Sequence, residues 1–223
     1  MEDKLKNVDL SSSKSHEEML GLLKEINDNN NKLIPDLSSA RYWENKAFMH
    51  RKFEEVGIPT PKTLIVSKEY FEFDQINISF PFLIKMIHSF ESKGIFKVNC
   101  LEDLNIVLES ISNVKEEFLI QEILNMRKDI RVIFVDNKIE LFYWRINNSN
   151  EWKPTATSKG NSVDFILFPE IHRETIENYS KALGLNIGAF DIAWQNDDLA
   201  TIPIVLEVSP VFSSVPVALS PLA

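Results

Sequence analysis

Four stretches of the chain carry apolar residues at helical spacing, and the short apolar runs between them have the length and flanking turn residues of strands. The pattern is clearest in the third helix, where an i, i+3, i+4, i+7 stripe is formed by Leu104, Val107, Leu108 and Ile111. The predicted helices are His16–Ile26, Glu44–Val56, the stretch that follows Asn99 through Ile111, and Ile171–Leu183. The predicted strands are Thr63–Ser67, Pro81–Met86, Glu117–Gln121, Asp129–Val135, Lys138–Arg145, Gly188–Trp194 and Ile204–Pro210.

The helix-cap and turn residues between these elements favour an α+β fold. Asn99 with Glu102 three residues later has the spacing of a capping box, which predicts that the third helix starts there. Asp136-Asn137 lies between two predicted strands and indicates a tight hairpin turn. Strands therefore alternate with helices and also form a hairpin, which argues for α+β lobes rather than one doubly wound sheet.

Residues 1–40 differ from the rest because they are polar and rich in Ser, Asn, Lys and Glu. We interpret them as an arm with one helix. The apolar face of that helix is small and consists of Met19, Leu22, Leu23 and Ile26. Such a face does not stabilise an isolated helix, so we expect this segment to pack on another surface.

Composition and charge exclude some classes of partner. The chain has 223 residues, 44% apolar and 26% charged, which is ordinary for a globular protein. Its formal net charge of −9 argues against nucleic acid and anionic membranes as partners. One cysteine, no signal-like apolar stretch after Met1 and no apolar run long enough to span a bilayer predict a cytoplasmic protein.

Two carboxylates lie inside apolar strands near the end of the chain, Asp191 and Glu207. An unpaired carboxylate in such a place costs several kcal/mol, about 2–7 for a polar group, so each needs a proton, a cation or a metal. The turn Gln195–Asp198 joins the two strands and would let both acids converge on one divalent cation, for which Mg²⁺ is suited. A proton-sharing or salt-bridged pair is the alternative.

Lys85 is a third charge in an apolar strand, Phe82-Leu83-Ile84-Lys85-Met86. Its ammonium either meets an anion or lies on a solvent face of the strand. The polar loop that follows, His88–Gly94, contains Ser92, Lys93 and Gly94, and the backbone N–H groups of such a loop can bind phosphate.

Several motifs occur in a familiar order. They are Asn45-Lys46, Val56-Gly57-Ile58-Pro59-Thr60-Pro61, Phe80-Pro81-Phe82-Leu83-Ile84-Lys85, Gln121-Glu122-Ile123-Leu124, Asp129-Ile130-Arg131, Phe190-Asp191-Ile192 and Leu206-Glu207-Val208-Ser209-Pro210. In this order and spacing the chain resembles the ATP-grasp superfamily, most nearly its RimK-like carboxylate–amine ligases. The resemblance implies a nucleotide cleft between an N-terminal lobe, residues 41–120, and a C-terminal lobe, residues 121–223. The usual domain before the opening lysine is largely absent.

The resemblance also implies roles for individual residues. It places ATP on Lys46, Lys85, Ser92, Gly94, Gln121, Glu122, Ile123, Asp129 and Lys153, with adenine on the backbone of Glu122 and Ile123 and ribose or a nearby polar group on Asp129. It places Mg²⁺, or Mn²⁺, on Asp191, Glu207 and Ser209. The transferring phosphoryl group falls to Arg131, Arg145 and Lys159. Ser209 stands where the family usually has Asn, and its hydroxyl is a weaker oxygen ligand.

The function implied is ATP-dependent amide formation between a carboxylate and an amine, an amino acid or a peptide, through an acyl phosphate. Two alternatives stay open: an ATP-binding regulatory or scaffold protein without ligase activity, and a phosphotransferase. Because few ordered residues precede Lys46, we expect a second copy or a partner protein to complete the substrate side of the cleft, with His16–Ile26 as the docking element.

Overall fold

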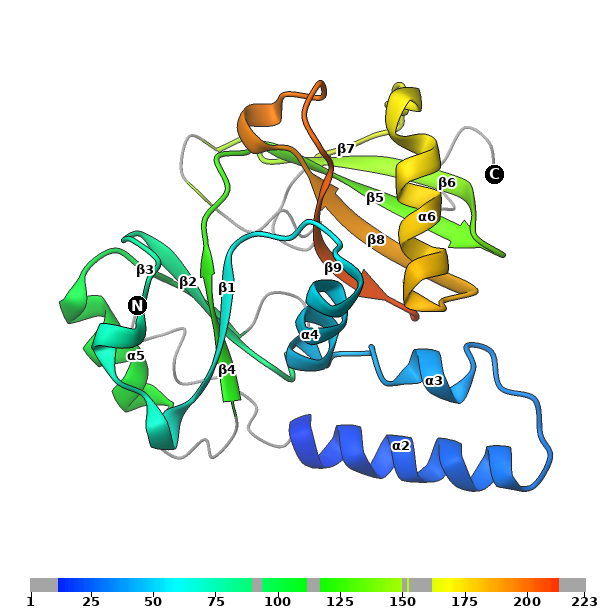
Figure 1. The fold of residues 1–223 in the computed structure, drawn as a ribbon, viewed down its shortest axis with the longest axis horizontal. Helices are drawn as coiled ribbons and strands as arrows, with labels where there is room; N and C mark the ends of the chain where they lie inside the picture. The colour runs from blue at the N-terminus through cyan, green and yellow to red at the C-terminus, as the bar shows by residue number, and fades with distance from the viewer. Residues whose placement is uncertain (1–11, 90–93, 112–116, 150–151, 153–161, 213–223) are drawn as a thin grey trace.

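Two antiparallel sheets with helices packed on them make up the fold (Figure 1). The computed structural model describes residues 12–89, 94–111, 117–149, 152 and 162–212. The helices are α2 (Ser12–Asp28), α3 (Leu37–Ala40), α4 (Lys46–Val56), α5 (Leu101–Ser110) and α6 (Arg173–Leu183), and the 3₁₀ turns are η1 (Lys68–Tyr70), η2 (Phe73–Gln75), η4 (Glu170–His172) and η5 (Gln195–Asp197). The α+β, two-lobed architecture expected from the pattern of elements is confirmed.

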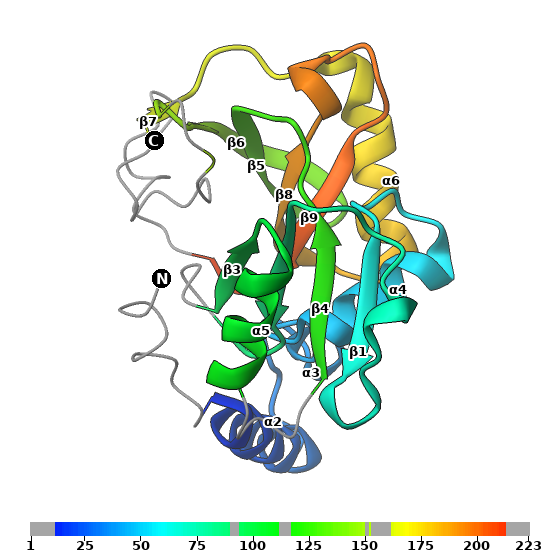
Figure 2. The same cartoon turned by 90° about the vertical axis from the view of Figure 1, so that its left-hand side faces the viewer.

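The first sheet has four strands in the order β1-β4-β2-β3. Its strands are β1 (Thr63–Ser67), β2 (Phe82–Met86), β3 (Ile95–Val98) and β4 (Glu117–Glu122). Side chains alternate across a strand, so Phe82 and Ile84 join the core under α5 while Leu83 and Lys85 face the other side of the sheet. That other side faces the second lobe, and α4 lies between the two sheets (Figures 1 and 2).

The second sheet has five strands in the order β7-β6-β5-β8-β9. Its strands are β5 (Lys128–Val135), β6 (Lys138–Ile146), β7 (Ser162–Asp164), β8 (Ile187–Ala193) and β9 (Ile204–Ser209). One face packs against α6 through an apolar cluster that includes Ile130, Phe134 and Phe190. The opposite face carries Asp129, Arg131 and Asp191, because these residues alternate with the apolar ones along β5 and β8.

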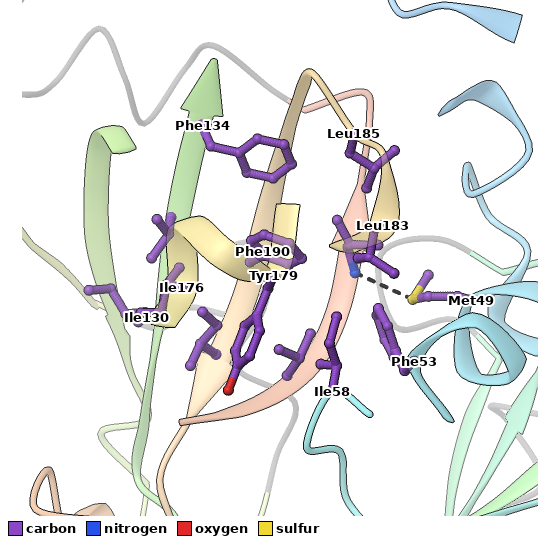
Figure 3. Close-up of a cluster of buried hydrophobic side chains, with 14 of the residues drawn as sticks. Met49, Phe53, Ile58, Ile130, Phe134, Ile176, Tyr179, Leu183, Leu185 and Phe190 are labelled. Carbon is purple, nitrogen blue, oxygen red and sulfur yellow. Dashed lines mark hydrogen bonds between the residues drawn. The ribbon is translucent and has the colours of Figure 1, made fainter. Parts of the chain in front are cut away.

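Helix α4 connects the lobes. Its residues Met49 and Phe53, together with Ile58, enter the core formed by α6 and the second sheet (Figure 3). The backbone N–H of Val208 donates to Met49 Sδ at 3.3 Å, the dashed line in Figure 3. The first turn of α4, where Lys46 lies, is thereby fixed beside β9. The proposed lobe boundary at residues 120/121 stays a prediction, since β4 continues to Glu122 and α4 packs with the second lobe.

The structure corrects several details. The capping box is wrong: Cys100 is the N-cap of α5 without a side-chain bond, and Asp103 Oδ2, not Glu102, accepts from the N–H and Nδ2 of Asn99 at 2.9 and 2.8 Å. Strands β3 and β7 were not predicted. The hairpin is confirmed, with Asp136 and Asn137 at φ 48° and 61°, the left-handed values that a type I′ turn requires.

The arm also differs from the expectation. Helix α2 extends over 17 residues and lies beside α3 (Figure 1). Of the four residues in the predicted apolar face, Leu22 is exposed, at 58%, whereas Met19, Leu23 and Ile26 are half-buried within the chain itself. No helix in the described ranges is long and apolar enough to cross a bilayer.

Candidate active site

Lys46 is buried at the first position of α4, with only 5% of its surface exposed. Asn45 caps the helix by accepting from the Phe48 N–H at 3.1 Å, which fixes where the helix begins. The Lys46 ammonium donates to the Ser89 carbonyl at 2.5 Å and to the Ser89 hydroxyl at 3.2 Å. A lysine from one motif is thus held against the loop that follows β2.

The base of that loop is tightly closed around Gly94. The Met86 N–H donates to the Gly94 carbonyl at 2.9 Å, and the Ser89 hydroxyl donates to the Met86 carbonyl at 3.1 Å. A Cβ at position 94 would lie 2.7 Å from Ser89 Cβ and 2.8 Å from Met86 Cβ. The contribution of Gly94 is therefore close approach of the two ends of the loop. Ser92, also assigned to nucleotide binding, lies outside the described residues.

Lys85 faces the inter-lobe side of β2 and makes no ion pair with any residue in the described ranges. Burial lowers the pKa of Lys85 to about 8; Glu207 and Asp191 act to raise it, and Lys46 lowers it further. The nearby carboxylates therefore compensate the loss of hydration only in part. Such a cation is electrostatically ready for an added anion.

The end of β4 forms a second potential contact for a nucleotide. Gln121 is buried, and its Nε2 donates to Thr63 Oγ1 at 2.8 Å. The Glu122 N–H donates to the Lys62 carbonyl at 2.9 Å, but the Lys62 N–H donates to the Glu122 side chain at 2.7 Å. The Glu122 N–H is therefore occupied by Lys62, and the expected contact of this backbone with adenine stays a prediction. Ile123 follows directly after the strand.

Four charged side chains form a buried network on the second sheet. Arg131 binds Asp191 through two hydrogen bonds of 2.6 and 2.7 Å, and Arg145 binds Asp129 through two of 2.8 and 2.5 Å. Arg145 also reaches Asp191 at 2.9 Å, which links the two pairs. The strand register accounts for this arrangement, because Arg131 is opposite Asp191 and Asp129 is opposite Arg145.

The ion pairs of this network shift the pKa values of Asp191, Arg131 and Arg145. Burial opposes the charge on Asp191, but Arg131 and then Arg145 outweigh it and lower the pKa of Asp191 to about 2. Burial likewise opposes the charge on both arginines, and their carboxylate partners raise the pKa of each above its usual value. Asp129 is fully buried against Arg145, so a contact between Asp129 and ribose would have to displace that arginine.

Asp191 and Glu207 lie directly opposite each other on β8 and β9, so the two carboxylates share one face, as the sequence predicts for a metal pair. A bulge next to this rung, between Asp191 and Ile192, shifts the register of the following residues. Ser209 points to the same face as Glu207, and its hydroxyl donates to the Val211 carbonyl. Within the described residues no cluster of three or more His, Cys, Asp or Glu side chains could hold a metal by itself.

This donor set fits Mg²⁺, which takes oxygen ligands and is commonly held by one or two carboxylates together with phosphate and water. Glu207 is half-buried and makes no ion pair among the described residues, so its carboxylate is available. Both Asp191 oxygens accept from Arg131. Asp191 would therefore share its carboxylate between a metal and the arginines.

Three residues near the site were missed by sequence reasoning. Glu44 precedes the cap of α4 at φ 49°, and its pKa is raised by burial and by Glu207, while Lys46 acts in the opposite direction. His50 lies one turn after Lys46, and burial, then Lys85 and Lys46, lower its pKa to about 3, so it is neutral. Lys97 is opposite Leu83 on the unpredicted strand β3 and shares the face of Lys85. The i, i+4 spacing of Lys46 and His50 could have indicated a shared helix face.

Two assigned cations, Lys153 and Lys159, lie outside the described residues. For the described candidates, the structure brings together Lys46, Lys85, Asp191 and Glu207 from four different elements. The two lobes contribute differently, because the lysines come from α4 and the first sheet and the carboxylates and arginines from the second sheet.

Comparison with known proteins identifies the fold and the family. The two lobes, each built on an antiparallel sheet, have the ATP-grasp fold. The RimK-like ATP-grasp domain family matches residues 43–215. The chain belongs to this family, whose members are ATP-binding ligases.

Individual relatives share the fold at low sequence identity. A RimK domain ATP-grasp protein from Sphaerobacter thermophilus has a TM-score of 0.66 at 16% identity, over 86% of this chain and 68% of that one. The D-alanine–D-alanine ligase of Bacillus anthracis, solved with ATP, has a TM-score of 0.62 at 20% identity, over 78% and 57% of the two chains. A protein of Saccharophagus degradans named "Probable alpha-L-glutamate ligase" is 25% identical over 131 residues, 58% of this chain and 42% of its own length. The match thus spans less than half of that curated relative.

Proposed function

We propose that this protein is an ATP-dependent carboxylate–amine ligase that forms an amide through an acyl phosphate. The observation that carries the proposal is the position of Lys85, which makes no ion pair with any described residue and lies where Glu207 and Asp191 of the other lobe act on its charge. A nucleoside triphosphate bound with a divalent cation requires positive charge beside its phosphates and carboxylates that hold the cation. Lys85 on one lobe, and Asp191 and Glu207 on the other, are groups of these two kinds. The family match and the ATP-bound neighbour support the nucleotide assignment.

In the proposed reaction Lys46 and Lys85 hold the α- and β-phosphates, and the end of β4 receives adenine. Asp191 and Glu207, with or without Ser209, would hold Mg²⁺, which supplies charge neutralisation for phosphoryl transfer when bound. Arg131 and Arg145 stabilise negative charge on the transferring phosphoryl group. The resemblance assigns Lys159 to the same phosphoryl group, with Lys153 as the other candidate cation in that segment. The carboxylate of the substrate attacks the γ-phosphorus, ADP leaves, and the amine then displaces phosphate to give the amide.

We propose an amino acid or a peptide as the substrate class. The support is the chemistry printed for the relatives, an alpha-L-glutamate ligase and a D-alanine–D-alanine ligase, both of which join amino acids. A second copy or a partner protein that completes the substrate side remains part of the proposal. Its docking element would use Leu22, the apolar residue of α2 that is left exposed.

Product analysis tests the proposal directly. Purified protein is incubated with ATP, Mg²⁺ and a panel of amino acids and dipeptides that includes L-glutamate, and ADP, phosphate and new amides are measured. A ligase gives the three products in equal amounts, and Glu207→Gln, which keeps the shape of the side chain but removes its charge, should abolish them. ATP binding without turnover would instead identify a regulatory or scaffold protein. A phosphorylated product without free phosphate would identify a phosphotransferase.

A further inference from the structure

His16 is a buried residue near the start of α2. It is 7% exposed, whereas its neighbours Glu17 and Glu18 are exposed. Its ring lies against that of His88, with centroids 4.7 Å apart and planes inclined by 38°. His16 Nε2 has no hydrogen-bond partner among the described residues. Ring packing against His88 is therefore one contact that holds His16 in its buried position.

His88 belongs to the loop that receives Lys46. Its Nδ1 lies 2.9 Å from the Glu44 carbonyl, two residues before Lys46. The next residue, Ser89, accepts both hydrogen bonds of the Lys46 ammonium. Three segments far apart in the sequence, α2, residues 44–46 and residues 87–89, thus meet through two adjacent loop residues.

We propose that His16 is a positioning residue for nucleotide binding. By packing on His88, it holds residues 87–89 where Ser89 receives the Lys46 ammonium, so that α2 supports the phosphate-binding lysine without touching the nucleotide. The physical reason is entropic: fixing a loop backbone has a free-energy cost, which a packed side chain offsets in advance of ligand binding. This inference rests on the proposed nucleotide site.

The contact is sensitive to acid. Burial, and then His88, lower the pKa of His16, while Glu17 acts in the opposite direction. A group with a lowered folded-state pKa favours the packed state when it is neutral. The contact is therefore fully present above the ordinary histidine value of 6.5 and is weakened progressively as pH falls below it. Two charged residues, Glu44 and Lys46, lie close to His88 through the Glu44 carbonyl and Ser89.

Two substitutions separate positioning from general stability. His16→Phe keeps a ring on His88 but cannot be protonated, and His16→Ala removes the ring. Lys24→Ala, at an exposed site on the same helix, is the matched control. The Kd of ATP with Mg²⁺ is measured by calorimetry at pH 8 and pH 6, together with the Tm of each nucleotide-free protein.

We expect His16→Ala to weaken ATP binding roughly three- to tenfold at pH 8, the range that loss of an aromatic pair gives. His16→Phe should match the wild type at pH 8 and lose less affinity than the wild type at pH 6. Wild-type affinity in His16→Ala at both pH values would overturn this inference alone. Equal pH profiles for the wild type and His16→Phe would do the same, and failure of the wild type to bind ATP would overturn the proposed function with it.

Discussion

The two sides of the cleft differ in whether their cationic side chains have carboxylate partners. On the second sheet, Arg131 and Arg145 are paired with Asp191 and Asp129 in one buried network. On the other side, Lys46 is bound by the neutral oxygens of Ser89, and Lys85 makes no ion pair with any described residue. Among the described residues, the two arginines have carboxylate partners at hydrogen-bond distance and the two lysines do not.

In the nucleotide-free protein, the arginine–carboxylate network therefore contributes to stability, whereas the two lysines keep their charge available for a ligand. A buried charge with a carboxylate partner stabilises one arrangement of the strands and is strongly destabilising only when that partner is removed. A half-buried lysine without a carboxylate partner instead raises the free energy of the unliganded protein, and an anionic ligand relieves it. Removing a charge should therefore have opposite consequences for stability on the two sides.

The largest expected effect is on the network side. Asp129→Ala leaves Arg145 buried with Asp191 as its remaining partner, and the free energy of unfolding should fall by about 3–5 kcal/mol. Urea unfolding measures this directly. The double variant Asp129→Ala with Arg145→Met should recover part of the loss, because it also removes the buried charge that has lost its bidentate partner. A loss below about 1 kcal/mol for the single variant would contradict the view of this network as structural.

On the lysine side, Lys85→Met should weaken ATP binding roughly 10- to 100-fold, the value of one charge-assisted hydrogen bond, without lowering the Tm of the free protein. The pH dependence of the free energy of unfolding gives a second measurement.

Between the folded pKa of Lys85, about 8, and the ordinary lysine value of 10.5, the unfolded chain holds a proton that the folded protein has lost. Wild-type stability should therefore rise with pH across this window relative to the variant.

A wild type whose stability does not rise relative to Lys85→Met above pH 8 would show that Lys85 has a partner in the free protein. A large fall of Tm in the variant, with ATP affinity preserved, would indicate a structural ion pair and would make the two sides of the cleft alike.

The smallest effect is expected at the base of the loop. Gly94→Ala introduces a Cβ that meets Ser89 and Met86 at 2.7 and 2.8 Å, so the base of the loop must shift, and we expect this to disturb the contact between Ser89 and Lys46. ATP affinity should fall roughly fivefold, equivalent to about 1 kcal/mol. Gly21→Ala is the control, because nothing lies within 4 Å of its added Cβ, and it should stabilise α2 by up to about 1 kcal/mol. Equal ATP affinity in both variants would show that the loop adapts without cost.

Local pattern predicted the elements that have a strong period or a turn signal of their own. The strand around Lys85, the Asp136-Asn137 hairpin and the helices at 44–56 and 171–183 were identified within two residues of their ends, with α4 and α6 each starting two residues later than expected. Strand β3 was missed, because its four residues carry only Phe96 and Val98 as an apolar face. Lys97 was therefore missed as a cleft-facing cation.

The sequence by itself determined that Lys85, Asp191 and Glu207 are charges within apolar strands, and that their motifs follow the order of the ATP-grasp family. Both features can be recognised from neighbouring residues alone, because they depend on the apolar pattern of each strand and on the spacing of the motifs. Only the tertiary structure decided their partners. Asp191 obtains Arg131 and Arg145 through cross-strand register, whereas Lys85 forms no ion pair with a carboxylate of the described residues. His16 reaches His88 from 72 residues away in sequence. Pairing across strands and lobes depends on register and packing, which no local pattern specifies.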